Sequence, residues 1–95
     1  MQKRAIIFKP DDMVAVVLDD VEKGDEVIVE GSLNLEITAI ERVPYGHKVA
    51  IVKIDKGMKV KKYGEIIGIA SLPIIQGEHV HVKNLESLRG RGDRK

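Results

Sequence analysis

The three histidines of this 95-residue chain are the residues best suited to chemistry, and each follows closely on a glycine turn. His47 comes after one such turn, and His79 and His81 come after another. Imidazole changes its charge near neutral pH and binds divalent metals, so these residues are candidate acids, bases or ligands. We take His47, at the mouth of an apolar segment, as the candidate catalytic residue.

His79 and His81 are two residues apart, so on a strand they project from the same face, with Lys83 next along it. Two such histidines are a real metal-ligand geometry, but a catalytic metal usually takes three protein ligands, so others must come from elsewhere. The alternative is a polar strand edge with Val80 and Val82 packed inward. Both interpretations remain open from the residues alone.

Lysines surround these histidines. Lys48 follows His47 and can hold a carboxylate as a point charge. Neighbouring residues on a strand point to opposite faces, so only one of these two faces a given pocket unless the strand begins after them. Lys59, Lys61 and Lys62 are interpreted as a solvated face, because the glycines near them do not form a phosphate-binding loop.

The elements that position these residues are predicted to be strands. Apolar and polar residues alternate over 33–39, and runs rich in β-branched residues occupy 27–29, 48–54 and 66–70. Residues 13–21 fit one face of a helix, whereas residues 14–18 also fit a strand, and the β-branched content favours the strand. Turns are expected at Gly24, Gly31, Gly46, Gly57, Gly64 and Gly77. The pattern is typical of a small all-β domain.

A weak internal repeat accompanies these turns. Residues 21–27 and 54–60 share the form aliphatic-x-Lys-Gly-x-x-Val, and residues 75–80 echo it with one residue fewer. Two aliphatic residues on either side of a glycine turn would fix a strand corner to the core. Coincidence of common turn chemistry explains the pattern equally well.

Length and composition limit the classes of function. Ninety-five residues suit one domain with a modest core, so a deep active-site cleft is not expected. The lack of cysteine excludes disulfides, thiolate zinc sites and cysteine nucleophiles. No apolar run approaches the roughly 20 residues of a membrane span, and no export signal is recognised. A cytoplasmic location without a membrane partner is therefore expected.

Charge is distributed unevenly along the chain. Residues 1–47 carry 5 basic and 10 acidic groups, whereas residues 48–95 carry 11 and 5, so the second half is expected to face anions. Aromatic residues make up 3% of the chain, which leaves no stacking platform for nucleic acid, and no nucleic-acid partner is expected. The basic residues 89–95 are interpreted as a flexible tail.

Several spaced motifs resemble those of one enzyme family. They are Gly46-His47-Lys48-Val49-Ala50, Ile54-x-x-Gly57-x-x-Val60-x-Lys62-Tyr63-Gly64-Glu65-x-Ile67-Gly68-x-Ala70, and Ile75-x-Gly77-Glu78-His79-Val80-His81-Val82-x-Asn84-Leu85. Together they resemble the amino-terminal SAF-type domain of altronate and galactarate dehydratases. Residues 14–18 and 21–24 resemble the opening strand and turn of that domain. The small subunit of sulfolactate sulfo-lyase is similar as well.

The resemblance implies a β-clip fold over residues 1–88, acting as the small subunit or domain of a sugar-acid hydro-lyase. A larger catalytic subunit would complete the active site and hold most of a divalent metal, iron or manganese. Dehydration of a dihydroxy acid needs a base, an electrophile and an acid. In this setting His47 would be the acid or base, Lys48, His79, His81 and Lys83 would bind substrate, and His79 and His81 would be candidate metal ligands.

One residue departs from the commoner family pattern. Lys83 stands where a third alternating histidine is expected, which argues against a three-histidine metal site and favours substrate contact. The alternatives are the small subunit of a sulfolactate sulfo-lyase, which is the competing substrate class, and a non-catalytic carbohydrate-binding or assembly module. A homo-oligomer is compatible with each of these functions.

Overall fold

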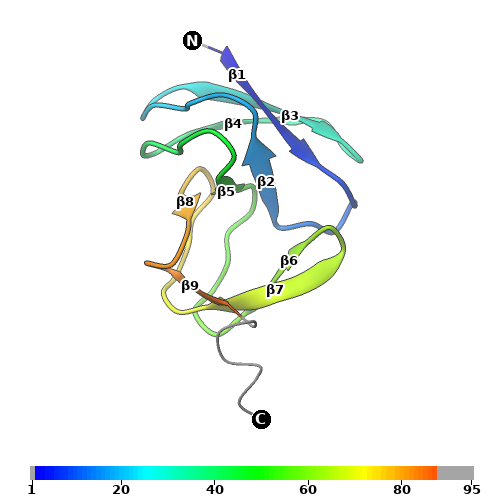
Figure 1. The fold of residues 1–95 in the computed structure, drawn as a ribbon, viewed down its shortest axis with the longest axis vertical. Coiled ribbons are helices and arrows are strands. Elements are labelled where there is room, and N and C mark those ends of the chain that lie inside the picture. The colour runs from blue at the N-terminus through cyan, green and yellow to red at the C-terminus, as the bar shows by residue number, and fades with distance from the viewer. Residues whose placement is uncertain (1, 88–95) are drawn as a thin grey trace.

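The computed structural model describes residues 2–87, which form two β-sheets packed on each other (Figure 1). The strands are β1 (Gln2–Ile7), β2 (Val14–Val17), β3 (Glu26–Gly31), β4 (Leu35–Thr38), β5 (Lys48–Ala50), β6 (Lys59–Lys62), β7 (Glu65–Ala70), β8 (His79–Val80) and β9 (Leu85–Ser87). The larger sheet has the order β4-β3-β1-β2-β5-β8, and the smaller sheet has the order β6-β7-β9. Residues 2–87 contain no helix, so the all-β prediction is confirmed.

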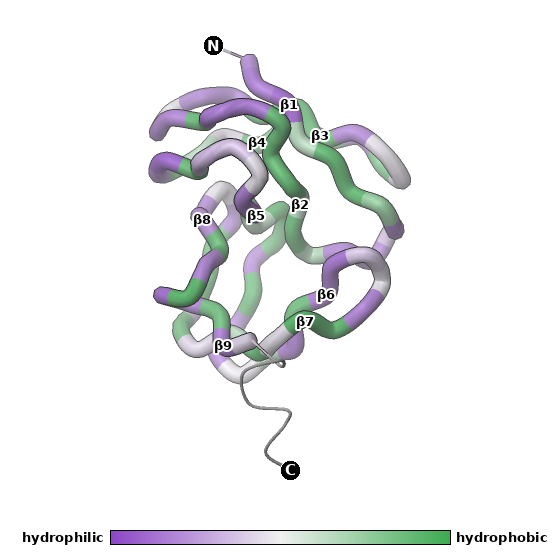
Figure 2. Tube along the Cα trace, viewed as in Figure 1, coloured by the Kyte–Doolittle hydropathy of each residue, from purple (hydrophilic) through white to green (hydrophobic). Residues whose placement is uncertain are grey.

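Alternating apolar residues build the core of the larger sheet. Ala5 and Ile7 of β1 lie beside Val27 and Val29 of β3, and all four are at most 1% exposed. These two strands run parallel, whereas the other paired strands are antiparallel. Figure 2 shows hydrophobic residues along β2 and β3, with hydrophilic residues in the outer loops. The period-2 pattern thus places one face of each strand inward.

A second core joins the two sheets. Val14 and Ala50 of the larger sheet pack in one buried cluster with Val60 and Ala70 of the smaller sheet. Since each of these side chains is at most 1% exposed, the sheets cannot separate without exposing apolar surface to water. This core holds β5 of the larger sheet close to β6 and β7 of the smaller sheet.

One glycine turn is used four times. In each copy the glycine N–H donates to the carbonyl of a facing segment: Gly24 to Ala39, Gly46 to Val17, Gly57 to Ala70 and Gly77 to Ala50. The aliphatic residues that begin these turns bridge in pairs, Val21 with Val43 and Ile54 with Ile74. The predicted reuse of one turn is therefore confirmed, but its third copy begins at Ile74 with full spacing, not at Ile75. The copy over 43–46 lacks the lysine of the motif and was missed.

Most predicted strands are present. The segments predicted at 14–18, 27–29, 33–39 and 66–70 overlap β2, β3, β4 and β7, and all six predicted glycine turns have positive φ angles. The strand predicted over 48–54 is shorter, because β5 ends at Ala50, and beyond it the Met13 N–H donates to the Lys61 carbonyl and not to Ile51. Three strands were not predicted: β1 and β6, whose charged residues obscure the apolar pattern, and the three-residue β9.

The buried carboxylate of Asp12 fixes the β6–β7 hairpin against the larger sheet. It accepts hydrogen bonds from the backbone N–H groups of Phe8, Lys9 and Gly64 at 3.1, 3.2 and 2.7 Å. Burial disfavours the charged form of Asp12, but these donors outweigh burial, so its pKa lies below the ordinary value. The hairpin that carries Lys62 is thereby held in place.

The predicted boundary between domain and tail, at residues 88 and 89, lies outside the described residues, as does the whole of the predicted tail 89–95. Within residues 2–87, no helix has the length and apolar character needed to cross a lipid bilayer.

Candidate functional site

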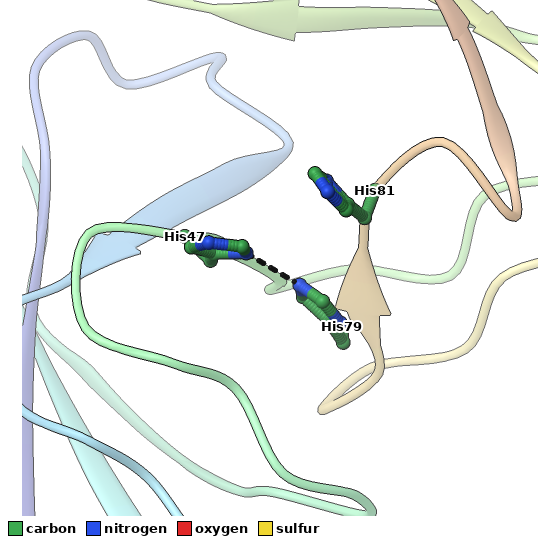
Figure 3. A group of neighbouring side chains, drawn as sticks. All are labelled: His47, His79 and His81. Atoms are coloured by element: carbon green, nitrogen blue, oxygen red, sulfur yellow. Dashed lines mark hydrogen bonds between the residues drawn. The ribbon is translucent and has the colours of Figure 1, made fainter.

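The three histidines, distant in sequence, converge at the edge of the larger sheet (Figure 3). His47 ends a glycine turn and directly precedes β5, while His79 begins β8 and His81 follows it. Strands β5 and β8 are antiparallel neighbours, with Val49 opposite His79. This pairing brings His47 to the pair of histidines in the other segment. We call His47, His79 and His81 the histidine cluster.

The rings of the histidine cluster are in close contact. His47 Nδ1 lies 2.9 Å from His79 Nε2, which is a hydrogen-bond distance. The ring centroids are 4.9 to 5.3 Å apart, and one nitrogen of each ring lies within 4.8 Å of the others. His47 and His79 are half-buried, and His81 is exposed. The histidine cluster is therefore accessible from solvent.

Burial and mutual repulsion keep two of these imidazoles neutral. The pKa of His79 is lowered to about 4, first by burial and then by the charges of His81, His47 and Lys83. The pKa of His81 is also lowered, first by desolvation and then by His47, Lys48 and Lys83. Neutral imidazole has a lone pair that accepts a proton or binds a metal. At pH 7 His79 and His81 can thus take either role.

Asn84, which is 1% exposed, fixes the backbone that carries His79 and His81. Its side-chain oxygen accepts a hydrogen bond from the His81 N–H at 2.9 Å, and its side-chain amide donates to the His79 carbonyl at 2.9 Å. The Asn84 N–H also donates to the His81 carbonyl at 3.0 Å. One buried side chain therefore positions both histidines, a role that the sequence pattern does not indicate.

We expect Asn84→Ala to destabilise the fold by about 2 kcal/mol, because it leaves the His81 N–H and the His79 carbonyl without their partner. The ring resonances of His79 and His81 in ¹H–¹⁵N spectra should also move. Urea unfolding measures the first effect. The control is Asn34→Ala, at an exposed asparagine, for which a change within about 0.5 kcal/mol is expected. Equal effects of the two substitutions would contradict the positioning role.

Lys83 does not continue the face shared by His79 and His81. Strand β8 ends at Val80, and residues 82–84 form a turn, so the prediction of one strand running to Lys83 is wrong. The Lys83 ammonium donates to both oxygens of Glu41, at 2.6 and 2.7 Å. Substrate binding by Lys83 stays a prediction.

Glu41 connects this lysine to the histidine cluster. Its second oxygen also accepts the His79 N–H at 3.0 Å. Burial acts against the charged form of Glu41, but the bonds from Lys83 and from the His79 N–H outweigh it, so its pKa lies below the ordinary value. Glu41 is a further residue of the site that no local sequence pattern indicates, because it lies in a bend 38 residues before His79.

The sequence left two alternatives for the segment from His79 to His81: a pair of metal ligands, or a polar strand edge with Val80 and Val82 packed inward. The structure modifies both. Val80 is buried, but Val82 is 82% exposed, so the inward packing suggested for both valines holds only for Val80. Although Lys83 stands where a third alternating histidine is expected, a third imidazole still lies beside His79 and His81. The third imidazole is His47, which comes from across the β5–β8 pairing.

An open hollow of about 290 Å³ adjoins the histidine cluster. It is lined by Lys48, Lys62, Ile67, His81, Val82, Leu85 and Ser87. The pKa of Lys48 is lowered by burial and by the nearby charge of Lys62. Lys62, interpreted as part of a solvated face, is half-buried and lines this open hollow. Its spacing of two residues from the core residue Val60 was the signal that could have shown this.

Comparison with known proteins gives consistent relatives. Residues 3–88 match the family described as the altronate/galactarate dehydratase SAF domain. The chain is 45% identical over 73 residues to an altronate dehydratase of Escherichia coli (strain K12), across 77% of this chain and 14% of that enzyme. It is 34% identical over 85 residues to an altronate dehydratase of Bacillus subtilis (strain 168), across 90% of this chain and 16% of that enzyme.

A second kind of relative is matched over nearly its whole length. The (2R)-sulfolactate sulfo-lyase subunit alpha of Chromohalobacter salexigens is 34% identical over 88 residues, across 88% of this chain and 94% of that subunit. Its name implies an enzyme built from more than one kind of subunit. By contrast, the chain spans only 14 to 16% of the length of the two dehydratases.

The relatives of both kinds are lyases by name, and the match to the SAF domain extends through every described strand. The resemblance read from the glycine and histidine motifs is confirmed. The chain belongs to the SAF-domain family of altronate and galactarate dehydratases.

Proposed function

We propose that this domain supplies imidazole and ammonium groups to the active site of a sugar-acid hydro-lyase, which a larger catalytic subunit completes. The observation that carries the proposal is the accessible histidine cluster beside a hollow lined by lysines. The hollow in the described part of the chain is small and open, whereas the dehydratase relatives are several times longer. The larger part would cover this surface and enclose the substrate.

His47 is the proposed acid or base. Dehydration of a dihydroxy acid requires removal of the proton next to the carboxylate and protonation of the departing hydroxyl group. When His47 Nδ1–H donates to neutral His79 Nε2, the lone pair of His47 lies on Nε2, where it can take a proton from substrate. His79 then holds the His47 ring in that tautomer.

Lys48, His81 and Lys83 are proposed to bind the substrate. Lys48 and His81 line the same hollow, so a carboxylate there would contact both the ammonium and the imidazole. Lys83 has three N–H donors, and the two oxygens of Glu41 take two of them. The third donor is proposed to contact a substrate hydroxyl.

The family implies a divalent metal, and the histidine cluster fits one. Three imidazole nitrogens lie within 4.8 Å of one another, and His79 and His81 are neutral at pH 7. Nitrogen donors suit iron better than manganese, which prefers oxygen. When bound, such an ion would polarise a substrate oxygen as a Lewis acid. His79 and His81 are the proposed ligands, with the remaining ones supplied by the larger subunit. In that bound form the lone pair of His79 would go to the ion and would no longer accept from His47, which stays the acid or base.

We expect the isolated chain to bind Co²⁺, used as a spectroscopic probe, with visible absorption that saturates at one equivalent. His79→Ala and His81→Ala should each weaken this binding by about 100-fold or more, since each removes a direct ligand. Asp55→Asn, at an exposed carboxylate elsewhere, is the control and should leave binding unchanged. Absorption that is unaffected by both histidine substitutions would remove the metal from the proposal.

The function is tested by mixing the purified chain with the larger dehydratase polypeptide of the same organism. We expect dehydration of altronate or galactarate by the mixture and not by either chain alone. No elimination from any acid would refute the proposal. Full activity of the larger polypeptide by itself would instead assign this domain a binding or assembly role.

A second candidate is a sulfo-lyase subunit, favoured by the alignment over 94% of the sulfolactate sulfo-lyase subunit alpha. The same assay distinguishes it from the first. Release of sulfite from (2R)-sulfolactate by a mixture that does not dehydrate sugar acids would establish this second function.

A further inference from the structure

Two lysines from different sheets face the hollow beside the histidine cluster. Lys48 lies on β5 of the larger sheet, and Lys62 lies on β6 of the smaller sheet. The second core packs these strands together, and Asp12 holds the hairpin that carries Lys62. The fold therefore brings two ammonium groups to one surface recess, from positions that are unrelated in the sequence.

Neither lysine is neutralised by a carboxylate within residues 2–87. The cations that form ion pairs there are Lys3, Arg4, Arg42, Lys53, Lys61 and Lys83. The described lining of the hollow includes no aspartate or glutamate. Lys48 and Lys62 are both half-buried, and the Lys62 ammonium also lies 4.6 Å from the centre of the Tyr63 ring. Among residues 2–87, the hollow thus has two positive charges and no negative one.

This arrangement is unfavourable for the domain alone. Like charges brought together and partly withdrawn from water each make the other harder to keep charged. The other two lysines of β6 avoid such an unpaired, half-buried position. Lys61 pairs with Asp11 at 3.0 Å, and Lys59 is exposed to solvent. Uncompensated charge of this kind in a recess is characteristic of a site that binds an ion of opposite sign.

We propose that Lys48 and Lys62 together bind the carboxylate group of a small hydroxy acid, and that Lys62 is a specificity-determining residue of this domain. The inference rests on the proposed function and adds to it the residue that the sequence analysis placed in solvent. The hollow is near the lower end of the volumes of small-molecule sites, about 300 to 1,000 Å³. His81 belongs to both the hollow and the histidine cluster, so an acid bound by the lysines reaches the imidazoles.

The ¹H–¹⁵N spectrum of the full chain, titrated with D-gluconate, tests this inference. We expect shifts concentrated at Lys48, Lys62 and His81, and none with sorbitol, which has no carboxylate. Lys62→Gln should weaken gluconate binding about tenfold, since it removes one charge-assisted bond. Lys59→Gln, at the exposed start of the same strand, is the matched control and should bind normally. Unchanged binding by Lys62→Gln, or the same shifts with sorbitol, would overturn the inference.

The assembled lyase separates this inference from the function on which it rests. Lys62→Gln should raise KM for the acid about tenfold while kcat changes less, and the variant should still associate with the larger subunit. If Lys62→Gln abolishes that association and gluconate does not bind the isolated chain, the anion is a carboxylate of the partner and the inference fails. If elimination is absent but Lys62→Gln still weakens gluconate binding, the inference stands and the proposed function fails.

Discussion

Replacing His47 with alanine is expected to lower kcat of the assembled lyase by about 100-fold or more, the typical contribution of a positioned acid or base. His47 is half-buried at the end of a turn, so its loss removes the proton-transferring ring and leaves the core intact. The measurement is the rate of elimination from sugar acid by the variant chain mixed with the larger subunit.

Tyr45→Ala is the matched control for His47→Ala. Tyr45 is on the same turn, and its side chain is 66% exposed. We expect this variant to turn over at nearly the normal rate. If His47→Ala is equally active, the imidazole of His47 has no catalytic role, and the histidine cluster serves binding or assembly.

Gly77→Ala should be the most damaging single-methyl change in the scaffold of the site. Gly77 has φ +92°, and a Cβ there would lie 2.2 Å from the backbone oxygen of Thr38. The residue also ties the turn before His79 to the larger sheet, since its N–H donates to Ala50 and its carbonyl accepts from Ile40. We expect a loss of about 3 kcal/mol or more in the free energy of unfolding, measured with urea.

Gly24→Ala separates the clash from the strain of the backbone conformation. Gly24 occupies the equivalent place in the first copy of the turn, with φ +91°, and a Cβ there meets no atom within 4 Å. Only the cost of the left-handed conformation remains, about 1 to 2 kcal/mol. Similar losses for both glycine variants would show that the contact with Thr38 does not determine the stability of the turn.

Local patterns in the sequence were sufficient for much of the fold. The alternation over 33–39 and the β-branched runs depend only on neighbouring residues, so they predict β2, β3, β4 and β7 correctly. The glycine turns were predictable for the same reason, because a positive φ angle favours glycine at the position itself. The motifs that reveal the family are largely these turns with the residues around them.

The arrangement of the site depends on pairing between distant segments, which these patterns do not specify. His47 joins His79 only because β5 pairs with β8, and the two residues are 32 positions apart. Lys62 faces Lys48 only because two sheets pack together. The chain also leaves the strand after Val80, which turns Lys83 toward Glu41. The sequence therefore identified the histidines but not their convergence.

The central claim is that the histidine cluster acts as one unit, and a double-mutant cycle tests it most directly. The measurement is kcat of the assembled lyase containing His47→Ala, His79→Ala or both substitutions. Because residues that act together lose their effect together, we predict that the double variant is no more than a few-fold slower than the slower single variant. Losses that multiply in the double variant, or near-normal rates in both single variants, would contradict this account.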